Sequence, residues 1–223
     1  MTAIQQVSLA LTAIWFALIM LRFRRSTVAL VAGLVVVGGY TIVSLIAGKV
    51  SLTELGLDAS RSWLATLKFA VIGLAVMLVY SPLADRVASH WFEKPPTLDS
   101  FRAIQGSMIN LVIGILIAWL LGGFLEELIA RGIILRSVEA FLKPWVVAQV
   151  ATTLAILIAA LGAGLMHSYQ GPRAVLIIAQ LSILFGILFV IRGYNLWTVI
   201  LCHGLYDTIA FIRFANKTSR YAQ

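Results

Sequence analysis

Long apolar runs alternate with short polar segments along the chain, and this pattern predicts membrane-spanning helices. Each run approaches or exceeds the roughly 20 residues that an α-helix needs to cross about 30 Å of hydrocarbon. About seven such helices are expected, with six or eight as the alternatives. They are placed at residues 4–23, 27–47, 63–80, 102–141, 145–166, 174–191 and 196–213. We therefore predict an all-α, polytopic membrane bundle.

Prolines mark several of the expected helix ends. Pro82 is predicted to end the third helix, and Pro95 and Pro96 to break the loop before the fourth. Pro144 and Pro172 are predicted to open the fifth and sixth helices, since the first turn tolerates a residue without an N–H group.

Two segments need a separate interpretation. The run 102–141 is about 40 residues long, nearly twice what a span requires. It is either one long tilted helix or a helix broken at Gly122-Gly123 whose second half runs differently. The segment Ser51–Ser60 alternates leucines with acidic and hydroxyl side chains, so we expect it to lie at the membrane interface.

The composition supports a membrane protein and argues against two other classes. Apolar residues make up 61% of the chain and charged residues only 12%, which is unlike a soluble domain. The net charge of +8 comes from basic residues scattered between the spans, so we expect membrane lipids and no nucleic acid as partners. The lone Cys202 excludes an internal disulfide framework. The first apolar run lacks a basic start, so we expect a retained span and not a cleaved signal peptide.

The basic residues also indicate an orientation. Seven crossings place ten Lys and Arg residues on the side of the C-terminus and six on the other side. The positive-inside rule then predicts a cytoplasmic C-terminus and an external N-terminus. We expect an integral, multi-pass protein of a bacterial inner (plasma) membrane.

Five ionisable side chains stand inside apolar runs or at the end of one. They are Glu126, Glu127, His167, His203 and Asp207. An ionised carboxylate in the middle of a bilayer costs roughly 2.5–3.5 kcal/mol on insertion scales. Because these groups come from three separate predicted helices, we expect them to meet in one shared cavity.

Helical spacing assigns different tasks to these groups. Glu127 and Arg131 are four residues apart and can form an ion pair on one helix face. Glu126 is rotated by about 100° from Glu127 and is available for chemistry. His203 and Asp207 are also four apart, so Asp207 either fixes the imidazole tautomer or contacts a substrate oxygen jointly with His203. Taken singly, each set also fits a structural role: a packing ion pair, an interhelical hydrogen bond, or an interfacial histidine.

Together these residues form three motifs that resemble a known family. Glu126, Glu127 and Arg131 read E-E-x-x-x-R, His167 ends a second motif, and His203 with Asp207 reads H-x-x-x-D. This order is similar to that of the CAAX prenyl endopeptidase and bacteriocin-processing (CPBP) family of intramembrane proteases, also called the type II CAAX protease or Abi family. The similarity covers about residues 122–211. One position departs, because Ala163 stands where the family has an aromatic residue.

The resemblance implies a glutamate-dependent intramembrane endopeptidase. The whole chain, 1–223, would be one membrane domain, with N-terminal helices in 1–101 and the catalytic core in 102–214. Glu126 and His167 are implied to activate a water, His203 and Asp207 to stabilise the tetrahedral intermediate, and Glu127 with Arg131 to hold the site together. A carboxylate in a low-dielectric cavity suits general-base chemistry. The implied substrate is a membrane-associated peptide or protein, either prenylated or carrying a leader.

A metal-dependent reaction is the main mechanistic alternative. Glu126 or Glu127 together with His167, His203 and Asp207 can supply three or four ligands to zinc or another divalent metal. The most suitable set is Glu126, His167 and His203. The chain has no H-E-x-x-H motif, so we prefer a mechanism without a metal or another cofactor.

Two other functions remain open at this point. One is a non-catalytic membrane scaffold or bacteriocin-immunity protein of the same fold. The other is a proton-coupled transporter that uses the Glu and His groups as a relay. A transporter would be expected to show internal repeats or paired broken helices, and the sequence shows neither.

Overall fold

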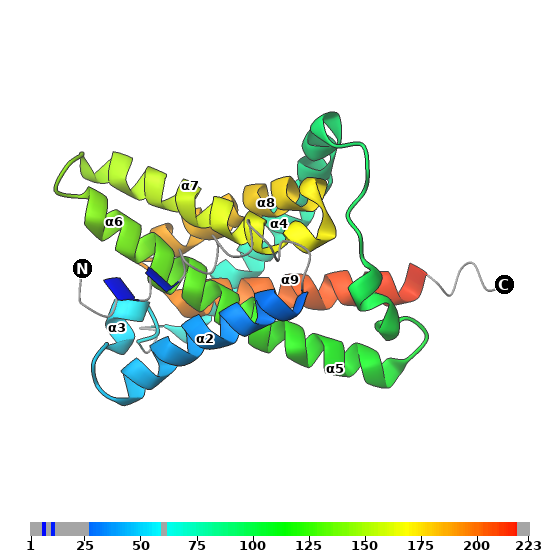
Figure 1. Cartoon of the computed structure of the whole chain (residues 1–223), viewed down its shortest axis with the longest axis horizontal. Helices are drawn as coiled ribbons and strands as arrows, with labels where there is room; N and C mark the ends of the chain where they lie inside the picture. Colours follow the sequence, from blue (N-terminus) through cyan, green and yellow to red (C-terminus); the bar gives the residue numbers. More distant parts are fainter. Residues whose placement is uncertain (1–5, 8–9, 12–26, 59–61, 218–223) are drawn as a thin grey trace.

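The computed structural model describes residues 6–7, 10–11, 27–58 and 62–217, and these residues form helices joined by short connections, with no strand among them (Figure 1). The prediction of an all-α, polytopic membrane bundle is confirmed. The elements are α2 (Thr27–Ile46), α3 (Leu52–Leu55), α4 (Trp63–Trp91), η2 (Asp99–Ile104), α5 (Met108–Ala118), η3 (Trp119–Glu126), η4 (Leu128–Leu135), α6 (Arg136–Leu142), α7 (Ala148–Met166), η5 (Ser168–Gln170), α8 (Pro172–Ile191) and α9 (Leu196–Lys217). The helix expected at 4–23 lies largely outside the described residues.

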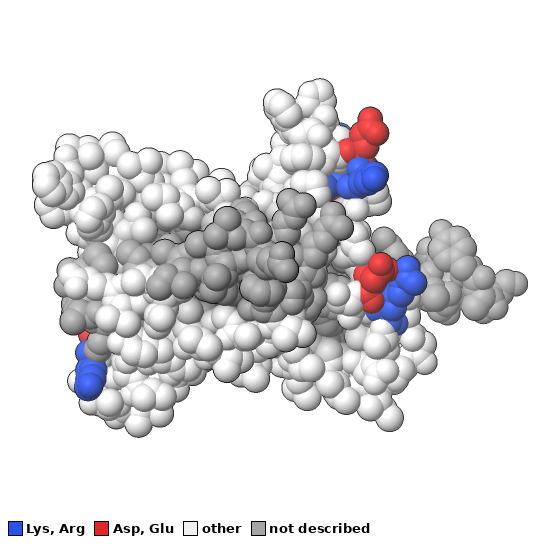
Figure 2. Space-filling model, viewed as in Figure 1, with Lys and Arg blue, Asp and Glu red and all other residues white. Residues whose placement is uncertain are grey.

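Five described helices are long and apolar enough to cross a membrane, namely Trp63–Trp91, Met108–Leu142, Ala148–Met166, Pro172–Ile191 and Leu196–Asn216. A shorter apolar helix covers Val31–Ile46. On the face in Figure 2, the acidic and basic side chains of the described residues lie toward the two ends of the long axis, and the described residues between them are uncharged. This distribution is the one expected of a chain whose middle faces hydrocarbon.

The long segment is one continuous helix over Met108–Leu142. It includes no break at Gly122-Gly123, so the first of the two expected paths is the observed one. Its central part, η3 and η4, is π-helical. Wider turns of this kind are rare and occur mostly at functional sites, and here they include Glu126 and flank Glu127.

Two proline predictions were wrong. Pro82 lies inside α4, which continues to Trp91; neighbouring helices and side chains can satisfy the carbonyl that such a proline leaves without a partner. α7 begins at Ala148, several residues after Pro144. Pro172 does open α8, in its first turn.

The segment Ser51–Ser60, expected at the membrane interface, packs one of its faces against the bundle. Ser51 and Glu54 form a capping box at the start of α3, but Leu55 and Leu57 are buried in the core. The carbonyl of Gly56 accepts a hydrogen bond from the N–H of Leu196 at the start of α9 (2.8 Å). Leu55 and Leu57 therefore contact the bundle, the interfacial position of the segment stays a prediction, and Ser60 lies outside the described residues.

α9 runs through the middle of the bundle, with α4, α5 and η3 packed against it (Figure 1). α7 and α8 form a helical hairpin, which also contacts α4 through α8. On the α4–α8 contact, the guanidinium of Arg173 donates to both carboxylate oxygens of Asp85, each at 2.8 Å. These contacts fix the turn between α7 and α8, where His167 lies, relative to the rest of the bundle.

Candidate active site

Glu127 and Arg131 form a buried ion pair at the centre of the long helix. The side chain of Glu127 is 0% exposed and that of Arg131 is 3% exposed. Nη1 of Arg131 donates to Oε1 of Glu127 at 3.0 Å, and Nη2 donates to the carbonyl and the hydroxyl of Ser182 on α8. The guanidinium also lies 5.3 Å from the centre of the Phe185 ring. Arg131 therefore joins the long helix to α8.

His203 of α9 contacts the same carboxylate oxygen. Its Nδ1 lies 2.7 Å from Oε1 of Glu127, and its ring stacks on Phe185 with the centroids 5.0 Å apart. An ionised carboxylate only accepts hydrogen bonds, so Nδ1 carries a proton and donates. Glu127 thus fixes the tautomer and the orientation of the ring, and leaves Nε2 as the atom that can act on a ligand.

Asp207 lies on the other side of the imidazole. Its Oδ2 is 3.5 Å from Nε2 of His203, and the carboxylate also interacts electrostatically with Glu126 and His167. The sequence left two roles open for Asp207, which were fixing the His203 tautomer or contacting a substrate oxygen jointly with His203. In the structure Glu127 contacts Nδ1 and so has the first of these roles, and Asp207 faces Nε2.

Glu126 differs from its neighbour in having no hydrogen bond or ion pair with any described residue. Its side chain is half-buried. Its carboxylate interacts electrostatically with the carboxyl group of Asp207 and with the hydroxyl of Tyr169. Glu126 is therefore the carboxylate of the pair that no group of the described residues holds by a hydrogen bond or an ion pair.

His167 follows the last residue of α7 and is half-buried. Its Nδ1 donates to the carbonyl of Ala163 at 3.0 Å, and its ring stacks on Tyr169 with the centroids 6.1 Å apart. As with His203, one nitrogen is held by the protein and Nε2 is left for chemistry. Ala163, where the sequence departs from the family pattern, thus contributes its backbone to the position of this ring.

Tyr169 was not singled out from the sequence. Burial raises the pKa of its hydroxyl, and the carboxylates of Glu126 and Asp207 raise it further. Because the Tyr169 hydroxyl responds to the charges of Glu126 and Asp207, the η5 turn lies near the same region as the long helix and α9. Its place two residues after His167 was the only signal in the sequence.

Glycines allow the long helix and α9 to approach each other closely. A Cβ on Gly123 would meet the backbone of Gly204 at 3.4 Å, and one on Gly122 would meet Oδ2 of Asp207 at 2.8 Å. Small residues of this kind permit close backbone contact between helices in membranes. The Gly122-Gly123 pair therefore does not break the helix but makes room for Asp207 beside it.

Residues 108–209 match the family model described as type II CAAX prenyl endopeptidase Rce1-like. This segment is similar to the Rce1-like family. It covers just under half of the chain and includes Glu126, Glu127, Arg131, His167, His203 and Asp207. No curated protein and no solved structure matches the chain. The match supports an intramembrane fold of the CAAX protease type for this segment, and members of that family act on prenylated peptides in membranes.

The side chains of the Rce1-like site do not form a metal cage in their present arrangement. Within the described residues, no group of three or more His, Cys, Asp or Glu side chains is placed to hold a metal ion. Nδ1 of His203 is engaged by Glu127, and Nδ1 of His167 by a carbonyl. Among the described residues, Nε2 of both histidines is left without such a partner, which is also the usual state of metal-ligating histidines, so the preference for a metal-free reaction stays a prediction.

Proposed function

We propose that the chain is an intramembrane endopeptidase that hydrolyses a peptide bond in a prenylated, membrane-associated peptide or protein. The observation that carries this proposal is the contrast between two adjacent carboxylates in the Rce1-like segment. Glu127 is fully buried and paired with Arg131 and His203, whereas Glu126 is half-buried and unpaired. Glu127 is therefore suited to position the other groups of the site, and Glu126 is suited to react with a water molecule or a substrate.

In this mechanism Glu126 takes a proton from a water, and the hydroxide attacks the scissile carbonyl. His167 assists through Nε2, because its Nδ1 is already bonded to Ala163. The carbonyl oxygen becomes an oxyanion in the tetrahedral intermediate. The proton held by Glu126 then passes to the leaving amine as the peptide C–N bond breaks.

His203 is placed to stabilise the oxyanion. Its Nδ1 proton is directed at Glu127, so donation from Nε2 requires the imidazolium form. Asp207 lies 3.5 Å from Nε2 and acts through His203, or in its own protonated form donates to the same oxygen. An ionised Asp207 in direct contact with the oxyanion would oppose the reaction.

The test is peptide cleavage by the purified full chain in lipid vesicles. The substrate is a fluorescence-quenched peptide that ends in a farnesylated C-a-a-X sequence, and the matched control is the same peptide without the prenyl group. We expect cleavage of the first, with the product identified by mass spectrometry, and little of the second. A chelator should leave the rate unchanged if no metal takes part. Failure to cleave any prenylated or leader-type peptide would favour the non-catalytic scaffold.

Replacement of Gly122 by alanine is expected to reduce this activity. The new Cβ would lie 2.8 Å from Oδ2 of Asp207 and 3.6 Å from Nε2 of His203, so the carboxylate must move. A displacement of about 1 Å in a catalytic site can cost about 10²-fold in rate. Gly39→Ala in α2 is the control, since its Cβ would have no neighbour within 4 Å. Equal rates for the two variants would argue against a role for Asp207.

A further inference from the structure

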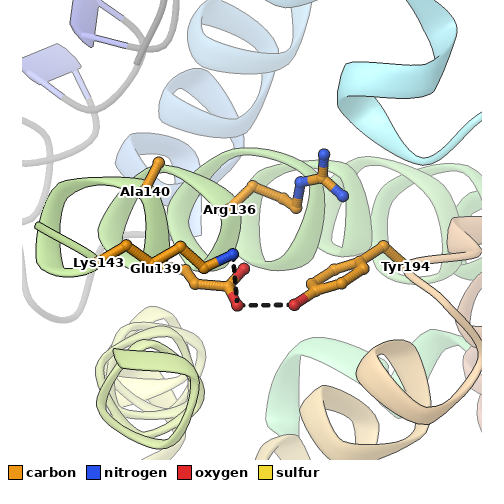
Figure 3. Close-up of a pocket in the computed structure, with 5 residues that line it drawn as sticks. All are labelled: Arg136, Glu139, Ala140, Lys143 and Tyr194. Atoms are coloured by element: carbon orange, nitrogen blue, oxygen red, sulfur yellow. Dashed lines mark hydrogen bonds and ion pairs between the residues drawn. The ribbon is translucent and has the colours of Figure 1, made fainter. Parts of the chain in front are cut away.

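A polar cavity lies away from the candidate active site, where the long helix ends. It has a volume of about 220 Å³ and is lined by Arg136, Glu139, Ala140, Lys143 and Tyr194 (Figure 3). The first four residues belong to α6 and the residue that follows it, and Tyr194 belongs to the turn between α8 and α9. This volume accommodates a phosphate group with its ester oxygens.

The only acid in this cavity already has its partners. Oε1 of Glu139 accepts hydrogen bonds from the hydroxyls of Thr152 and Tyr194, each at 2.6 Å, and Nζ of Lys143 lies 3.4 Å away. Burial, followed by the contact with Glu139, raises the pKa of Tyr194 to about 12, so its hydroxyl remains a donor. The acid is therefore held by the protein.

The two cations retain capacity for a ligand. The side chain of Lys143 is 51% exposed, and an ammonium has three donors. Arg136 stacks over the Tyr194 ring at 4.7 Å and has no hydrogen bond or ion pair with any described residue. Two cations and one carboxylate leave the cavity with a net charge of +1, which favours an anion.

The position of the cavity relative to the membrane indicates which anion would bind there. Leu142 is the last residue of the membrane-spanning helix, and Lys143 follows it. Phe141 and Trp145 on either side are 61% and 77% exposed. Exposed aromatic residues next to a basic residue at the end of a span are typical of the headgroup region of a bilayer. An anion at this level is most readily the phosphate of a lipid.

We propose that Arg136 and Lys143 bind the phosphate of an anionic phospholipid headgroup in this cavity. The guanidinium offers paired N–H groups and the ammonium a mobile point charge, and both suit phosphate oxygens. The site lies at the end of the long helix that also carries Glu126 and Glu127, but it shares no residue with the candidate active site. The proposal does not depend on peptidase activity.

The test is native mass spectrometry of the full chain released from detergent after titration with phosphatidylglycerol or phosphatidylcholine. We expect one phosphatidylglycerol to be retained at concentrations where phosphatidylcholine is lost. Arg136→Gln and Lys143→Gln should each weaken retention about fivefold, the usual effect of one cation near an anionic membrane. The matched control is Lys49→Gln, which removes an exposed cation that does not line the cavity.

A second variant keeps the test decisive if the charge variants fold poorly. Ala140→Leu fills the cavity without changing its charge and should also release the lipid. Equal retention of the two lipids, or retention unaffected by Ala140→Leu and by the charge variants, would overturn the proposal. So would a rise in thermal stability on adding inorganic phosphate that equals the rise with phosphatidylglycerol, because the ligand would then be a free anion.

Discussion

Replacement of Glu126 by glutamine is expected to lower cleavage of a prenylated peptide by about 10²–10⁴-fold, the usual contribution of a general base. The amide cannot take a proton from water. Since Glu126 has no hydrogen bond or ion pair with any described residue, the substitution removes no such contact and should leave thermal stability nearly unchanged. The measurement is the cleavage rate together with the melting temperature of the same preparation.

The matched control for this experiment is Glu93→Gln. Glu93 is exposed in the loop after α4, and its backbone carbonyl, which the substitution leaves in place, accepts a hydrogen bond from Arg173. The Glu93→Gln protein should cleave the prenylated peptide at the wild-type rate. If Glu126→Gln is as active as this control, the proposed mechanism is wrong, whatever the fate of the lipid site.

Replacement of Glu127 by alanine is expected to lower the free energy of unfolding by about 3–5 kcal/mol, the cost of removing one partner of a buried pair. Arg131 would lose its counter-charge and His203 its Nδ1 acceptor, both inside the bundle. The measurement is unfolding in mixed micelles followed by tryptophan fluorescence. Activity should be lost as well, but the loss of stability is what distinguishes this residue from Glu126.

Two further variants show whether the loss of stability comes from the contacts that Oε1 of Glu127 makes with Arg131 and His203. Arg131→Ala should destabilise to a similar extent, and the double variant Glu127→Ala with Arg131→Ala should cost less than the sum of the two. The exposed Glu93→Ala should change stability by no more than about 0.5 kcal/mol. A Glu127→Ala protein as stable as that control would contradict the structural role.

The sequence predicted the helices well because hydrocarbon thickness leaves a strong mark on the pattern of apolar residues. It could not place every boundary. Pro82 reads as a helix end in a soluble protein, but a membrane helix is held by its surroundings and continues past it. The same limit applies to Leu55 and Leu57, whose spacing does not show whether lipid or protein covers them.

The candidate site was predictable within helices and much less so between them. The i, i+4 spacing correctly indicated that Glu127 and Arg131 can meet. It could not show that His203 shares the same oxygen, because the rotation of α9 relative to the long helix depends on packing around Gly123 and Gly204. The π-helical turns and the bond from Arg131 to Ser182 also arise from tertiary contacts that no local pattern contains.

The shared oxygen of Glu127 also bears on how the chain enters the bilayer. Arg131 and Glu127 lie on one helix, so they can pair before any other helix is present and enter the hydrocarbon core as a neutral unit. His203 is 76 residues away from Glu127 and reaches the oxygen only when α9 packs. Pairing within the long helix therefore does not depend on the packing of α9, and α9 brings His203 to a carboxylate that Arg131 can already hold.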